Sequence, residues 1–86
     1  MPADSAAESA LRPALRECVA FAVRRYLDDM NTQMPDSLYE LVLSQVEAPL
    51  LAEVLRWSGG NQSKAAAALG INRATLRKKL ANRGLS

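Results

Sequence analysis

The chain contains 86 residues, with 11 basic and nine acidic side chains, a single cysteine and no histidine. This composition supports one small domain and excludes both an internal disulfide and a zinc site built on histidine and cysteine, so we expect no metal, no cofactor and a core extended by self-association. No segment reaches the roughly 20 apolar residues that a membrane span requires, and the lone cysteine without a signal-peptide pattern suits a soluble protein of a reducing cytoplasm.

Charge is distributed unevenly along the chain. All nine acidic residues lie at or before Glu53, whereas seven of the 11 basic residues follow it. The C-terminal third is therefore strongly basic and the preceding part is acidic. This segregation is typical of a chain that presents a positive face to a polyanion, and nucleic acid is the commonest partner of that kind.

We interpret residues 1–12 as a mobile N-terminal arm, because this segment is rich in alanine, serine and acidic residues and has little to bury. The first helix is predicted to begin at Pro13, a residue suited to the first turn, and to end near Asn31. Apolar residues recur there at steps of three and four and form one stripe: Leu15, Val19, Ala22, Val23, Tyr26, Leu27 and Met30.

A long second helix is predicted from the Ser37 cap to about Ser58. Ser37 and Glu40 fit a capping box, in which the Ser37 hydroxyl accepts a hydrogen bond from the Glu40 amide and the Glu40 carboxylate reaches back. Pro49 lies in the middle of this helix, where it removes one backbone hydrogen bond, and we expect a kink there. A break into two helices is the alternative.

The second helix carries more apolar surface than one stripe. Its apolar positions are Leu38, Leu41, Val42, Val46, Leu50, Leu51, Val54, Leu55 and Trp57. Such a helix must be buried on more than one side. We place Trp57 in the core. The remaining helices of one chain are too few to cover the second helix. We therefore predict that residues 13–58 are the dimerisation helices of a homodimer with a four-helix core.

Residues 59–86 are predicted to form a helix-turn-helix DNA-binding unit. Two glycines, Gly59 and Gly60, end the long helix, and Asn61 can cap a short third helix that ends near Leu69.

A fourth helix follows the turn at Gly70. Asn72 is placed to cap it, and Ile71 and Leu76 have the spacing of a hydrophobic staple. Leu76 and Leu80 are expected to hold the fourth helix against the third. This layout is that of a helix-turn-helix, which places its second helix in the DNA major groove.

The candidate DNA-binding residues lie at the two helix starts and on the basic fourth helix. A phosphate can sit on the N-terminus of the third helix, and an arginine near the start of a recognition helix can bind guanine N7 and O6 through two hydrogen bonds. The candidates are Asn61, Gln62, Ser63, Lys64, Asn72, Arg73, Thr75, Arg77, Lys78 and Lys79.

The sequence does not favour an enzyme, and we assign no catalytic residue. Glu40, Glu47 and Glu53 are six or seven residues apart on the second helix, but they have no histidine, metal partner or glycine-rich phosphate loop to work with. We interpret them as a solvated helix face.

In four segments the chain resembles the Fis family, the bacterial factors for inversion stimulation. The segments that carry the resemblance are Leu38-Tyr39-Glu40-Leu41-Val42-Leu43, Val46-Glu47-Ala48-Pro49-Leu50-Leu51, Gly60-Asn61-Gln62 and Gly70-Ile71-Asn72-Arg73-Ala74-Thr75-Leu76-Arg77-Lys78-Lys79-Leu80. The resemblance implies an all-α fold with four helices per subunit, an intertwined homodimeric core and a C-terminal helix-turn-helix. Pro49 matches the proline that kinks the family's long helix.

The resemblance also implies a nucleoid-associated factor and transcriptional regulator that binds and bends double-stranded DNA. The two recognition helices of such a dimer would be too close together to enter successive major grooves of straight DNA. The deformability of the DNA sequence would therefore contribute to binding specificity. Family positions associated with DNA contact match Asn61, Ser63, Asn72, Arg73, Thr75, Arg77 and Lys78, with Asn72 and Arg73 toward the bases. RNA polymerase is a candidate partner, although the turn before the third helix, which in relatives can carry an arginine that touches the polymerase, reads Ser58-Gly59-Gly60 here. We expect no membrane partner.

Two alternatives remain open from the sequence. The helix-turn-helix also ends many larger enhancer-binding activators, so the chain can be a detached module of one of them. It can also be a helical protein-interaction module that uses its basic helix as a docking face.

Overall fold

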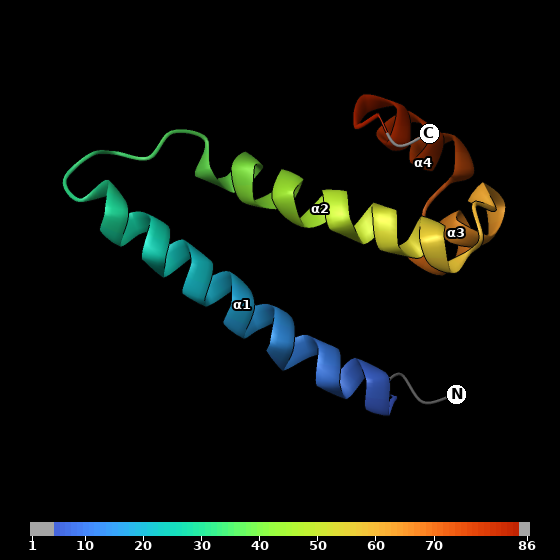
Figure 1. Cartoon of the computed structure of the whole chain (residues 1–86), viewed down its shortest axis with the longest axis horizontal. Coiled ribbons are helices and arrows are strands. Elements are labelled where there is room, and N and C mark those ends of the chain that lie inside the picture. Colours follow the sequence, from blue (N-terminus) through green and yellow to red (C-terminus); the bar gives the residue numbers. More distant parts are fainter. Residues whose placement is uncertain (1–4, 85–86) are drawn as a thin grey trace. The chain divides into compact units, whose positions relative to one another are not determined.

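The computed structural model describes residues 5–84 and shows four helices in chain order: α1 (Ala6–Met30), α2 (Leu38–Trp57), α3 (Gln62–Leu69) and α4 (Arg73–Asn82) (Figure 1). No strand occurs within these described residues, so the predicted all-α fold is confirmed. None of the helices in this part of the chain is long and apolar enough to cross a membrane. The chain divides into a unit that contains α1 and a unit, from Ser37 onward, that contains α2 to α4.

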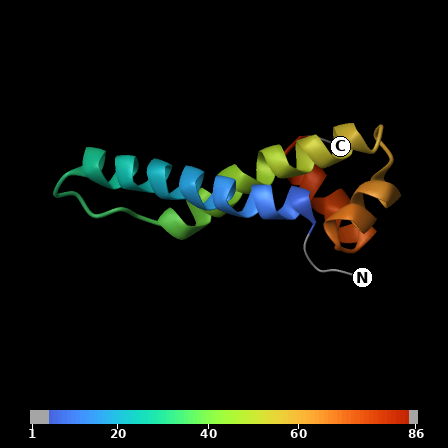
Figure 2. The same ribbon diagram turned by 90° about the horizontal axis from the view of Figure 1, so that it is seen from below.

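Helix α1 starts earlier than the sequence analysis predicted. Ser5 and Glu8 form a capping box, in which the Glu8 amide donates to Ser5 Oγ at 3.1 Å and the Ser5 amide donates to the Glu8 carboxylate at 3.3 Å. The start predicted at Pro13 is therefore wrong, and α1 continues through Pro13 without a break (Figure 2). Of the predicted mobile arm, residues 6–12 are helical, and residues 1–4 lie outside the described residues.

Helix α2 is one continuous helix, as predicted, but its start differs in detail. Ser37 has a left-handed backbone, with φ of 56°, and its side chain makes no cap hydrogen bond, so the predicted capping box with Glu40 is not formed. The helix runs through Pro49 without ending there. The break into two helices is thus excluded, and the kink stays a prediction.

The core of the second unit lies where the C-terminal half of α2 meets α3 and α4 (Figure 1). It consists of Leu51 from α2, Ala65 and Ala66 from α3, and Leu76 and Leu80 from α4, all at most 4% exposed. The two alanines allow close approach of the helices because their side chains are small. Val54, Leu55, Leu69 and Ile71 pack around this centre.

Much apolar surface outside this core is exposed in the single chain. No residue within Ala6–Met30 is buried, and Phe21 of α1 is 65% exposed. On α2, Leu43, Val46 and Leu50 are exposed and, spaced by three and four residues, share one face of the helix. Trp57 is 58% exposed, so its predicted place in the core is wrong for the single chain.

Candidate nucleic-acid interface

A glycine turn sets the angle between α3 and α4. The Gly70 amide donates to the Ala66 carbonyl at 2.9 Å, and the Ile71 amide donates to the same carbonyl at 3.1 Å. Gly70 has φ of 75°, the left-handed conformation that side chains with a Cβ rarely adopt. An added Cβ would meet no atom within 4 Å, so the backbone angle and not lack of space requires glycine here.

Both helix starts are capped by asparagine side chains, as predicted. Asn61 Oδ1 accepts from the Lys64 amide at 3.1 Å, and Asn72 Oδ1 accepts from the Ala74 amide at 2.7 Å. These bonds commit the carbonyl oxygen of each side chain to its own helix. The cap bond orients the Asn72 side chain, and its amide nitrogen is a hydrogen-bond donor, which suits phosphate oxygens or the acceptors of a purine edge.

Most of the predicted DNA-binding residues lie on the surface of this unit. The exposed members are Asn61, Ser63, Lys64, Asn72, Arg73, Thr75, Arg77 and Lys78. Gln62 and Lys79 are only half-exposed. Leu76 and Leu80 are buried on the other side of α4, as predicted, and this fixes which side of the helix carries the exposed residues.

The cations of the exposed set differ in how they are engaged. Arg73, Arg77 and Lys78 form no ion pair with any residue in 5–84. The Lys64 ammonium lies 4.5 Å from the centre of the Trp57 ring, in a cation–π contact that leaves its charge uncompensated. Within residues 5–84, these four side chains therefore present positive charge without an acidic partner, at the start of α3 and on the exposed side of α4.

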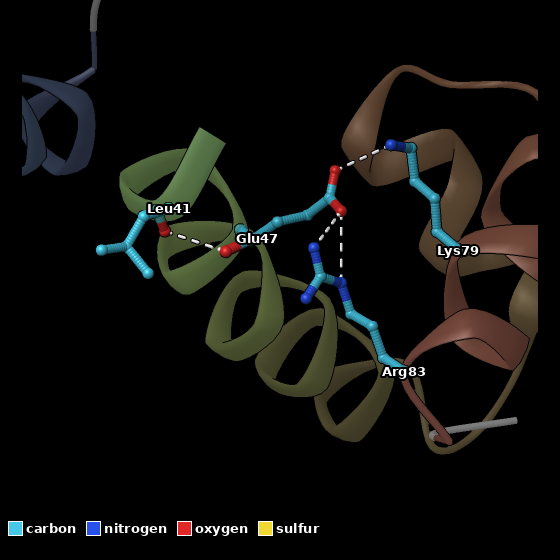
Figure 3. A network of polar contacts seen from close by, with 5 residues as sticks. Leu41, Glu47, Lys79 and Arg83 are labelled. Carbon is cyan, nitrogen blue, oxygen red and sulfur yellow. Dashed lines mark hydrogen bonds and ion pairs between the residues drawn. The ribbon is translucent and has the colours of Figure 1, made fainter. Parts of the chain in front are cut away.

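Lys79 is held differently, by a carboxylate of α2. Its ammonium donates to Glu47 Oε2 at 2.8 Å, and Arg83 Nη2 and Nε donate to Glu47 Oε1 at 2.6 and 3.2 Å (Figure 3). We call these three residues the Glu47 bridge. Its hydrogen bonds from Lys79 and Arg83 hold the pKa of the Glu47 carboxyl below its usual value, because they favour the charged form.

The Glu47 bridge corrects one sequence interpretation and adds a residue that the sequence analysis missed. Glu47 is only half-exposed and paired with two cations, so it does not belong to a freely solvated face. Arg83 was not among the candidate site residues. The sequence carried only a partial signal: Lys79 and Arg83 each follow a predicted core leucine, Leu76 or Leu80, by three residues. This spacing directs the two cations toward the core side but does not identify Glu47 as their partner.

The exposed groups have the chemistry of a nucleic-acid surface. Guanidinium groups can bind guanine or phosphate through two hydrogen bonds, and an ammonium group serves as a point charge for phosphate. The α3 N-terminus adds partial positive charge from its backbone amides. Arg73 lies in the first turn of α4, the part of a recognition helix that reaches base edges.

Comparisons with known proteins agree with this geometry. The family model described as "Bacterial regulatory protein, Fis family" matches residues 42–82. A putative Fis-like DNA-binding protein of Xylella fastidiosa is 59% identical over 71 residues, which cover 83% of this chain and 79% of that protein. The DNA-binding protein Fis of Psychromonas ingrahamii is 55% identical over 71 residues, covering 83% and 72% of the two chains.

A third relative matches a longer part of the chain. The DNA-binding protein Fis of Aeromonas hydrophila is 49% identical over 81 residues, which cover 94% of this chain and 82% of that protein. The matches thus take in most of the residues that form α1 to α4, together with the glycine turn and the exposed cations. The chain belongs to the Fis family of bacterial regulatory proteins.

Proposed function

We propose that this chain forms a homodimer that binds and bends double-stranded DNA, acting as a nucleoid-associated factor and transcriptional regulator. The observation that carries the proposal is a set of three exposed cations on α4 that have no ion-pair partner in residues 5–84: Arg73, Arg77 and Lys78. They follow the Gly70 turn and the Asn72 cap in the chain. The proposed contacts also include Asn61, Gln62, Ser63, Lys64, Asn72 and Thr75. Relatives that match at 72–82% of their own length are named DNA-binding proteins, which supports the same function.

The homodimer is supported by the apolar surface that the single chain leaves exposed. Leu43, Val46 and Leu50 share one exposed face of α2, and α1 contains no buried residue. Covering a leucine side chain is worth about 1.5–3 kcal/mol, so a second copy that buries these faces gains a large hydrophobic contribution. A two-fold pair of chains would place the two α4 helices at a fixed separation.

The dimer is tested by sedimentation equilibrium. Leu50→Asp places a charge on the exposed face of α2 and is expected to shift the protein to monomer, because burial of an unpaired carboxylate is costly. Asn82→Asp adds the same charge on the exposed side of α4 and should leave the dimer intact. A wild-type protein that is monomeric at all concentrations would contradict the proposal.

DNA binding and bending are tested by gel shift on circularly permuted duplexes. If a dimer neutralises about six to eight phosphates, its affinity falls about 10³ to 10⁴-fold between 50 and 200 mM salt. The mobility of the complex should vary with the position of the site, as expected for bent DNA. A DNA-binding constant that hardly depends on salt would contradict the proposal. A mobility of the complex that does not depend on site position would show that the protein binds DNA without bending it.

RNA polymerase is the proposed protein partner, on the basis of the family resemblance. The turn before α3 reads Ser58-Gly59-Gly60, and the charged residue nearest to it in the sequence is Arg56, which is paired with Glu53 at 2.7 Å. Activation of transcription from a promoter with an upstream site, compared between wild type and Arg56→Ala, tests this contact. Equal activation by the two proteins would exclude Arg56 from it.

A further inference from the structure

The inner side of α4 carries polar as well as apolar groups. Leu76, Lys79 and Leu80 lie on one side of α4, and Arg83, the residue that caps its C-terminal end, follows Leu80 by three residues. The two leucines are buried in the core, and the two cations bind Glu47 (Figure 3). The ion pairs thus extend the leucine contact between α4 and α2.

Glu47 occupies the matching position on α2. It precedes the buried Leu51 by one turn, so it belongs to the side of α2 that meets α4. Both of its carboxylate oxygens are used, Oε1 by Arg83 and Oε2 by Lys79. Hydrogen bonds between charged groups of this kind are shorter and stronger than neutral ones.

Lys78 and Lys79 are neighbours with opposite environments. Lys78 is exposed and has no ion-pair partner in residues 5–84, whereas the side chain of Lys79 is 38% exposed and lies 2.8 Å from Glu47. The Arg83 side chain is still less accessible, at 22% exposed. For Lys79 or Arg83 to reach a phosphate, it would have to give up its ion pair and leave the half-buried Glu47 carboxylate with one of its two partners, which is costly.

We infer that Glu47 is a positioning residue that withholds Lys79 and Arg83 from the DNA backbone and fixes α4 on α2. This inference rests on the proposed function, because it states which cations of α4 the DNA encounters. It restricts the basic surface of α4 to Arg73, Arg77 and Lys78. Through Glu47, α2 also holds α4 in place, and α2 is the helix that carries the proposed dimer face.

The first experiment compares two adjacent lysines through the salt dependence of DNA binding by the full-length protein. The slope of log K against log salt decreases by about 0.9 for each phosphate contact that is lost. Lys78→Gln should flatten the slope by about 1.8 for a dimer, since each subunit loses one contact. Lys79→Gln should leave the slope at the wild-type value.

The second experiment removes the carboxylate. Glu47→Gln frees two cations per subunit, so the salt slope should become steeper, by up to about 3.6 if all four reach phosphates. Glu47→Asp keeps the negative charge and should retain most of the wild-type slope. Glu53→Gln is the matched control, because it removes the same charge from the same helix but releases only Arg56, a residue of α2.

The outcomes separate this inference from the proposed function. A flattening by Lys79→Gln as large as that by Lys78→Gln, with DNA binding retained, would overturn the inference alone. An unchanged slope for folded Glu47→Gln, as judged by circular dichroism, would also overturn it by leaving Glu47 a purely structural role. If Glu47→Gln does not fold, the comparison of the two lysine variants decides. A wild-type protein that binds no duplex would overturn the proposed function and the inference together.

Discussion

Arg83 Nη2, just beyond the end of α4, lies 2.6 Å from Glu47 Oε1 in the middle of α2, 36 residues earlier in the chain. This contact links the end of α4 to α2, and the placement of α4 on α2 decides which side of α4 is exposed. The contact adds to the packing of Leu76 and Leu80, and its acceptor is a carboxyl group that can be protonated. The stability of the unit should therefore depend on pH through one carboxyl group.

The pH dependence has a definite sign. Because the folded-state pKa of Glu47 lies below its ordinary value of 4.5, the bridge stabilises the fold above that pH, and this contribution is lost as pH falls through the folded pKa. We expect wild type to have a higher Tm than Glu47→Gln at neutral pH, and the two Tm values to converge once the pH falls below the folded-state pKa of Glu47. Thermal unfolding followed by circular dichroism gives both values. A difference that persists unchanged at acid pH would show that the carboxylate charge is not its cause.

Arg73→Ala should weaken binding to a preferred duplex by about 1–3 kcal/mol, because it removes the side chain that we propose to read a base edge. The loss should be much smaller on a scrambled duplex, and the dimer should remain intact. Gel-shift titrations on both duplexes measure the difference. Arg24→Ala, on α1 and outside the helix-turn-helix unit, serves as the control for a lost arginine. Equal losses on the two duplexes would assign Arg73 to phosphate contact.

Leu80→Ala should reduce the free energy of unfolding by about 2–5 kcal/mol, because Leu80 is fully buried and its loss opens a cavity between α4 and the rest of the core. Leu80→Met conserves the volume and should cost less than about 1.5 kcal/mol. Urea denaturation at one fixed protein concentration compares the three proteins. Similar losses for both variants would contradict the packing of α4 through this residue.

Gly70→Ala tests the turn. With φ of 75° and no neighbouring atom in the way, the expected cost of about 1–2 kcal/mol comes from backbone conformation alone. Gly70→Asn should be less damaging, because asparagine adopts the left-handed conformation more readily. The midpoint of urea unfolding reports both. If alanine were tolerated as well as asparagine, the turn would not depend on this conformation.

Local signals made the C-terminal unit predictable. The Asn61 and Asn72 caps, the left-handed Gly70 and the buried Leu76 and Leu80 all follow from residues within a few positions of one another, and the structure confirms each of them. Side-chain caps and glycine turns need no information about distant parts of the chain.

The helix starts show where local signals become ambiguous. The capping-box pattern stands at the start of two helices, at Ser5 with Glu8 and at Ser37 with Glu40, and only the first box forms. A capping residue needs an extended backbone, which Ser5 has with φ of −107°, whereas Ser37 has φ of 56°. The conformation of the connector before Ser37 decides this, and the pattern itself does not contain it.

The Glu47 bridge could not be read from spacing alone. Glu47 is separated from Lys79 and Arg83 by 32 and 36 residues. Its formation depends on which face of α2 receives α4. The basic run Arg77-Lys78-Lys79 consequently looked uniform in sequence, although its third member faces α2 and the first two are exposed.

The contact between Lys64 and Trp57 gives this protein a built-in optical probe. Trp57 is the only tryptophan in the chain, and its exposed ring carries a charged ammonium group at 4.5 Å from its centre, at the start of α3. Indole emission is sensitive to nearby charge and to hydration, so any event that draws Lys64 away from the ring alters the signal. Occupation of the α3 N-terminus can thus be followed in solution without a label.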